Sequence, residues 1–105
     1  MGLDIVELVM RVEEDFLVEL PDEECGQMRT VGDLYRLVLK KLRLEYKPAR
    51  EIEKEPHTVG RGVVKAPLTT SDVWYTVKEI IVDQLHVDPD DVREDSTFLD
   101  DLGVD

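Results

Sequence analysis

The sequence is poor in cysteine, in aromatic residues and in long apolar runs, and each shortage excludes a class of protein. Cys25 is the one cysteine, so no disulfide can form within the chain, which fits a reducing compartment. Aromatic residues make up 6%, which leaves little for a large sheet sandwich. No apolar run reaches the roughly 18–20 residues that a bilayer span requires, so we expect that the chain is not an integral membrane protein. The start, MGLDIV, lacks the basic region and cleavage site of a signal peptide, and a cytoplasmic location is therefore expected.

Basic residues are scarce as well. The chain has 13 Lys and Arg against 25 Asp and Glu, a formal net charge of −12. This acidity argues against a nucleic-acid binder, because phosphate contacts need Lys and Arg, and it favours partners with basic surfaces. The charge is uneven: residues 1–42 (the head block) have a net charge of −5, residues 43–68 of +2, and residues 69–105 (the tail block) of −9.

The head block predicts three helices. Apolar residues recur at helical spacing over residues 3–17, namely Leu3, Val6, Val9, Met10, Val12 and Phe16. A short helix is expected within PDEECGQM, starting at Pro21 or Asp22. Thr30 followed by Asp33 resembles a capping box, with Asp in place of Glu, for a third helix that ends near Leu42.

The tail block predicts one further helix and a long acidic loop. Thr70 or Ser71 can cap a helix that ends near His86. The loop that follows is too acidic and rich in turns for a long helix, but its apolar residues can pin it to the core: Val87, Val92, Phe98, Leu99 and Leu102.

The middle, residues 43–68, holds three of the five prolines and two of the six glycines. No apolar face repeats there, so it is interpreted as a linker, with a short strand near residues 59–64 as an alternative. Four helical segments without a convincing strand pair predict an all-α fold.

No group of residues predicts catalysis or a dedicated metal site. The acidic run at residues 88–91 lacks the glycine of a calcium-binding loop at the required position. His57 and His86 have no second ligand at metal spacing, and nothing beyond their presence joins Ser71 and His86 to an Asp as a catalytic triad. Cys25 lies in an acidic segment, which raises the pKa of a thiol instead of activating it. We therefore expect no enzyme.

One surface feature does predict a function. The carboxylates of Asp4, Glu7, Glu13 and Glu14 project from one helix, with the apolar Met10 between them. A solvated helix face is the simplest interpretation. In a chain of such acidity, the face is also a candidate docking surface for partners rich in Arg and Lys.

Both blocks resemble the acyl carrier protein family. Residues 71–105, beginning SDVWYTVKEII and ending DLGVD, resemble the front half of that family, and residues 3–42 resemble its back half. The motifs DLGVD, LDIVELVM, LPDEE and TVGDLY match in spacing and character. The halves stand in reversed order, so residues 1–42 correspond to the C-terminal half, residues 43–68 to a linker and residues 69–105 to the N-terminal half. The resemblance implies a bundle of three long helices and one short one, here with permuted connectivity.

The resemblance also implies a cofactor. In the family, a serine between the two halves carries 4′-phosphopantetheine. The positions that would flank this serine hold Asp105 on one side and Gly2 and Leu3 on the other, while Ser71 and Ser96 fall elsewhere in the pattern. Because the transfer needs a hydroxyl nucleophile, we expect no cofactor on the chain as written.

The partners implied are acyl-chain synthases, transferases and the phosphopantetheinyl transferase. By position in the family pattern, the docking residues are Asp4, Glu7, Met10, Glu13 and Glu14. Arg11 replaces a small apolar residue common in the family and is expected to weaken or redirect docking. His86 replaces a common glycine in the turn after the first helix of the family.

Two alternative origins would explain the reversed order. One is a circular permutation, and the other is a cut through two tandem carriers that keeps the linker between them. The halves would then pair within one chain or swap between two chains as a dimer. We expect a carrier-like domain from fatty-acid or polyketide-type biosynthesis without its attachment serine. The alternative function is a non-acylated acidic interaction module.

Overall fold

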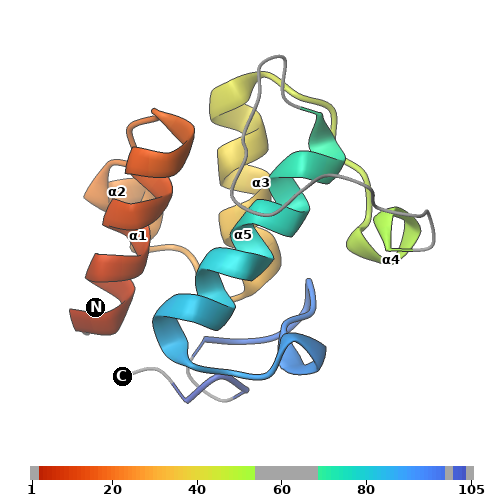
Figure 1. Ribbon diagram of the computed structural model, residues 1–105. Helices are drawn as coiled ribbons and strands as arrows, with labels where there is room; N and C mark the ends of the chain where they lie inside the picture. The colour runs from red at the N-terminus through yellow and green to blue at the C-terminus, as the bar shows by residue number, and fades with distance from the viewer. Residues whose placement is uncertain (1–2, 54–68, 99–100, 104–105) are drawn as a thin grey trace.

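The computed structural model describes residues 3–53, 69–98 and 101–103, and within them helices are the regular elements and no strand occurs. The helices are α1 (Leu3–Phe16), α2 (Asp22–Cys25), α3 (Val31–Leu42), α4 (Ala49–Ile52) and α5 (Thr70–Leu85), followed by the 3₁₀ turn η1 (Pro89–Asp91). α5 is the central element, because α1, α3, α4 and η1 all pack against it (Figure 1). The all-α prediction is confirmed. No helix among the described residues is long and apolar enough to cross a membrane.

α1 buries a different stripe from the one that the sequence predicts. The side chains that face the core are Ile5, Leu8, Val9, Val12 and Phe16. Val6 and Met10 were counted in that stripe, but they are 39% and 53% exposed. The stripe was wrong for these two because several apolar residues in the helix allow two overlapping stripes, and the packing of α5 selects one. The exposure of Met10 agrees with its other predicted place, among the docking residues.

The ends of the long helices follow local rules that the sequence displays. Thr30 caps α3 by accepting from the N–H of Asp33 at 3.1 Å, and the Asp33 carboxylate accepts from the N–H of Thr30 at 3.1 Å. The predicted capping box is therefore confirmed. Leu17, which follows α1, and Arg43, which follows α3, both have positive φ values, 55° and 58°.

α5 begins one residue earlier than predicted. Its cap is Thr69, not Thr70 or Ser71, because a capping box needs an acidic residue three positions later and Asp72 satisfies that spacing only for Thr69. The Thr70 hydroxyl donates instead to the carbonyl of Glu45. At the other end, α5 closes at His86, which adopts the left-handed conformation with φ 57°.

The start of the expected linker packs onto the fold. α4 lies within residues 43–68, and its Ala49 and Ile52 are 4% and 3% exposed. The Tyr35 hydroxyl of α3 donates to the carbonyl of Lys47 at 2.7 Å, and Ala49 N–H donates to Glu94 at 2.9 Å. A fifth helix is therefore added to the four that were expected. The remainder, residues 54–68 with the alternative strand, lies outside the described residues.

The tail loop is held to the core as predicted. Val92, Phe98 and Leu102 are buried, Val87 packs partly against the core, and Leu99 lies outside the described residues. An isolated antiparallel bridge joins this loop to the head block at Thr30 and Thr97. Around it, the N–H of Val31 donates to the carbonyl of Ser96 at 2.9 Å, and that of Phe98 to the carbonyl of Arg29 at 3.0 Å. The two blocks are thus joined by backbone pairing as well as by a shared core.

Candidate functional site

The exposed face of α1 carries most of the predicted docking residues. Glu7, Met10 and Glu14 are all exposed. Val6, which was expected to face the core, is exposed as well, and Leu17 just beyond the helix is 89% exposed. On a helical wheel, Val6 and Met10 form one strip with Glu7 and Glu14 along its edge, and Leu17 follows the end of the helix. We define the docking face as Val6, Glu7, Met10, Glu14 and Leu17.

Glu13 has a different environment from the other predicted docking residues. It is half-buried, and its Oε2 accepts from the N–H of Leu20 at 3.0 Å. Its carboxylate therefore holds the loop between α1 and α2. The side chain of Asp4 lies outside the part of the structure that is described.

The expected attachment region is only partly described. Leu3 is the first residue of α1, whereas Gly2 and Asp105 fall outside the described residues. Figure 1 places the start of α1 at the same end of the bundle as the loop that follows η1. The two chain segments that a family member joins through its serine therefore approach the same end of the fold.

The hydroxyl of Ser96 is not presented as a nucleophile. The Ser96 side chain is buried, and its Oγ donates to the carbonyl of Asp91 at 2.7 Å while accepting from the N–H of Arg93 at 3.0 Å. Both bonds hold the loop after η1. Ser71 is half-buried in the first turn of α5.

Arg11 lies beside the docking face but contacts α5. Its guanidinium forms an ion pair with Asp83, and its Nε lies 4.0 Å from the Asp15 carboxylate. One residue further along α5, Gln84 donates to Glu7 at 3.2 Å. The sequence marked Arg11 as a departure from the family pattern, but its partner on α5 could not be read from spacing, because the two residues are 72 positions apart.

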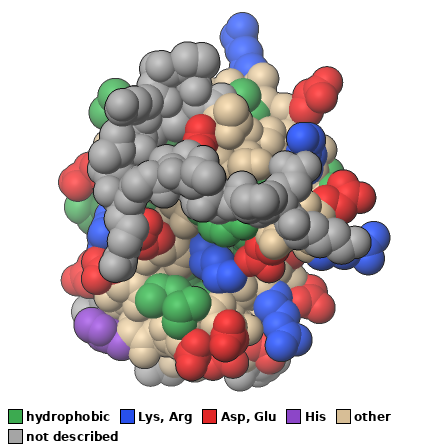
Figure 2. Space-filling view, turned by 45° about the vertical axis from the view of Figure 1, so that its right-hand side comes forward, with side chains coloured by type: hydrophobic (Ala, Val, Ile, Leu, Met, Phe, Trp, Pro, Cys, Tyr) green, Lys and Arg blue, Asp and Glu red, His purple; other side chains and the backbone are tan. Residues whose placement is uncertain are grey.

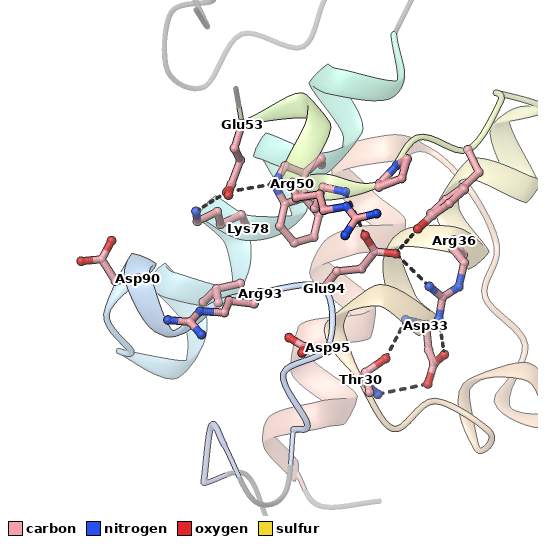
Figure 3. A pocket seen from close by; sticks show the side chains of 15 residues that line it. Thr30, Asp33, Arg36, Arg50, Glu53, Lys78, Asp90, Arg93, Glu94 and Asp95 are labelled. Carbon is pink, nitrogen blue, oxygen red and sulfur yellow. Dashed lines mark hydrogen bonds and ion pairs between the residues drawn. The ribbon is translucent and has the colours of Figure 1, made fainter. Parts of the chain in front are cut away.

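Residues of α3, α4, α5 and the loop after η1 line a groove of about 1020 Å³. Glu94 is its central residue: it accepts from Arg36 at 2.9 Å and from the Tyr46 hydroxyl, as well as from the backbone of Ala49 (Figure 3). Across the groove, Glu53 pairs with Lys78 at 2.6 Å. Acidic and basic side chains are interspersed over this face (Figure 2), so it offers no single-sign surface for nucleic acid.

The groove perturbs the titration of the groups that line it. The pKa of Tyr46 is raised mainly because its hydroxyl donates a hydrogen bond to Glu94, and burial adds to the effect. The pKa of Asp33 is lowered although burial opposes this, because the Arg29 and Thr30 N–H groups and Arg36 donate to its carboxylate. The bonds around Glu94 could not be predicted from the sequence, because their members come from three distant segments.

The remaining candidates for chemistry occupy structural positions. Burial raises the pKa of the Cys25 thiol, and the nearby carboxylates add to the increase, as the acidic segment predicted. Asp88 caps η1 by accepting from the N–H of Asp90 at 3.0 Å. His86 is exposed, and His57 lies outside the described residues. Among the residues that the structure describes, no three His, Cys, Asp or Glu side chains are grouped to hold a metal ion.

Comparison with known proteins identifies acyl carrier proteins as relatives. The chain is 56% identical over 37 residues to the acyl carrier protein of Wolinella succinogenes, covering 35% of the chain and 49% of the relative. It is 50% identical over 37 residues to that of Clostridium acetobutylicum (35% and 48%). It is 53% identical over 39 residues to that of Syntrophobacter fumaroxidans (37% and 48%).

The chain thus spans about half the length of the curated relatives it matches. No protein-family model matches the chain. No solved structure matches it either. The resemblance inferred from the motifs is confirmed over about a third of the chain.

Proposed function

We propose that this chain folds as one acyl-carrier unit whose two halves stand in reversed order. The observation that carries the proposal is the shared core: α1 and α3 of the head block both pack on α5 of the tail block, and backbone hydrogen bonds join the blocks. A half-carrier alone would leave these apolar faces uncovered. The parent carrier would hold acyl groups as phosphopantetheine thioesters for fatty-acid or polyketide-type biosynthesis, in the cytoplasm and without catalysing a reaction itself.

In the parent carrier, the arm is proposed to attach at the junction between the segments that here end at Asp105 and begin at Leu3. These 105 residues offer no serine there, and the bonds of Ser96 leave its hydroxyl committed to the loop. The chain as written is therefore proposed to accept no phosphopantetheine. A serine directly before Leu3 would restore the family pattern on the head side of the junction.

A gain-of-function variant tests both statements. The parent and Gly2→Ser are incubated with a phosphopantetheinyl transferase and coenzyme A, and their intact masses are measured. We expect the mass of one phosphopantetheine on Gly2→Ser and no change in the parent. The control is Gly2→Ala, which alters the same position without adding a hydroxyl. Modification of the parent would contradict the missing site, and no modification of a folded Gly2→Ser would count against the carrier arrangement.

The reversed order is proposed to arise from a cut through two tandem carriers. The intervening residues 43–68 support this origin over a designed permutation, because a designer would choose a linker of Gly and Ser. Pairing within one chain gives a monomer, and exchange gives a half-swapped dimer. Sedimentation equilibrium over a wide concentration range distinguishes the two.

The docking face supports a second candidate function, a non-acylated acidic interaction module. Its strip of exposed apolar side chains beside Glu7 and Glu14 suits a partner with an apolar pocket and basic rim. Synthases, transferases and the phosphopantetheinyl transferase are the partners proposed. Glu14→Lys should weaken such docking and its salt dependence, whereas Asp95→Lys, on the loop after η1, should matter less. A partner that binds without any acyl cargo would favour the module over the carrier.

A further inference from the structure

Arg11 is surrounded by carboxylates on its own helix. Residues three and four positions apart are neighbours on a helix surface, so Glu7, Glu14 and Asp15 all lie within reach of Arg11. Two of them, Glu7 and Glu14, belong to the docking face. An arginine that paired with them would cancel the charge that a basic partner needs.

The structure gives Arg11 another partner. Its guanidinium pairs with Asp83 on α5, and its contact on α1 is with Asp15, the acidic neighbour outside the docking face. Among the described residues, Arg11 makes no ion pair with Glu7 or Glu14. Glu7 accepts instead from the amide of Gln84, which is neutral and adds no opposite charge.

We infer that Asp83 is a positioning residue for the docking face: it holds Arg11 against α5 and so leaves the charges of Glu7 and Glu14 for a basic partner. This inference rests on the proposed docking role of α1. It also explains how the chain tolerates an arginine beside an acidic surface, since the compensating carboxylate comes from the other block. The electrostatics of the docking face then depend on the pairing of the two halves.

The ion pair between Arg11 and Asp83 should affect docking more than it affects the stability of the fold. The side chains of Arg11 and Asp83 are 36% and 65% exposed, and exposed ion pairs contribute little to stability. A charge at the rim of an interface, by contrast, changes the association rate and its dependence on salt. Removal of Asp83 should therefore alter docking while the protein stays folded.

The first test needs no partner. The ¹³C signals of the Glu7 and Glu14 carboxylates are recorded by NMR at neutral pH for the parent, Asp83→Asn, Arg11→Gln and the double variant. We expect Asp83→Asn to shift at least one of these signals as Arg11 swings toward them, and no such shift when Arg11→Gln is also present. Signals that stay in place in Asp83→Asn, or that move equally without Arg11, would overturn the inference.

The second test measures docking with a helical peptide rich in Arg and Leu, by fluorescence anisotropy at low and high salt. Asp83→Asn should weaken binding about two- to fivefold at low salt, the range expected for one exposed charge pair. The loss should shrink in the Arg11→Gln background. Asp95→Asn is the matched control, because it removes the same charge from an exposed loop position.

The outcomes separate the two proposals. Equal losses from Asp83→Asn with and without Arg11 would show that Asp83 acts only as a bulk charge, which overturns the inference. If the parent does not bind the peptide at all, the proposed docking role fails, while the carboxylate signals still decide whether Asp83 holds Arg11. Circular dichroism confirms that each variant is folded.

Discussion

Gly32 and Glu94 approach so closely that no side chain fits between them. A Cβ atom on Gly32 would lie 2.6 Å from both the Cγ and the carbonyl oxygen of Glu94. The N–H of Gly32 donates to that same carbonyl at 2.8 Å. Since Gly32 lies in the first turn of α3 and Glu94 follows η1, the contact fastens the head block to the tail block.

Gly32→Ala is expected to destabilise the protein by about 1–3 kcal/mol, the usual cost of overpacking. The backbone carbonyl of Glu94 cannot turn aside as a flexible side chain would, so the two blocks must separate slightly. Chemical denaturation measures the change. Gly26→Ala is the control, because Gly26 has right-handed helical angles and its nearest contact is 3.3 Å away. Equal effects of the two substitutions would contradict the close approach.

Ile52→Ala tests whether the start of the expected linker belongs to the fold. Ile52 is 3% exposed, and truncation of a buried isoleucine costs about 2–5 kcal/mol. The free energy of unfolding should therefore fall by an amount in that range. Arg50→Ala, at an exposed position of the same short helix, should change it by less than about 0.5 kcal/mol. A detached linker would give no difference between the two variants.

Asp33 should make the free energy of unfolding depend on pH. The pKa of Asp33 is lowered in the folded protein, so its contribution is present above the pKa of the unfolded chain, about 3.9, and is lost as the pH falls through the folded value. Asp33→Asn should therefore be less stable than the parent near pH 6, and the gap should narrow below about pH 4. Thermal unfolding between pH 2 and pH 6 tests this, with Asp22→Asn as a control at an exposed acidic position in α2. A gap that does not change with pH would contradict the prediction.

His86→Gly should stabilise the protein. His86 is exposed and has a φ of 57°, a conformation that disfavours side chains and that glycine adopts freely. The sequence already marks this position as one where the family commonly has glycine. We expect a gain of about 0.5–1 kcal/mol in the free energy of unfolding, seen as a higher Tm. Ser71→Gly, inside α5, should instead lose stability, and a loss at position 86 would mean that His86 makes a stabilising contact.

Local patterns in the sequence were sufficient for most of the helices. Apolar spacing, the Thr30–Asp33 box and the acidic starts of the helices all act within a few residues, so α1, α2, α3 and α5 could be located to within one or two positions. The resemblance to acyl carrier proteins rests on the same kind of short motif. α4 was missed because a helix of four residues among prolines has no period, and it depends on contacts with distant segments such as the burial of Ala49 and Ile52.

The sequence by itself determined the net charge, the helical class and the acidic character of α1. Tertiary structure decided which of two overlapping stripes of α1 is buried, and so exposed Val6 and Met10. It also paired Arg11 with Asp83 and Arg36 with Glu94 across the two blocks. The reason is physical: helix periodicity and capping are short-range, whereas an ion pair between residues far apart in the chain exists only after the core has brought their helices together.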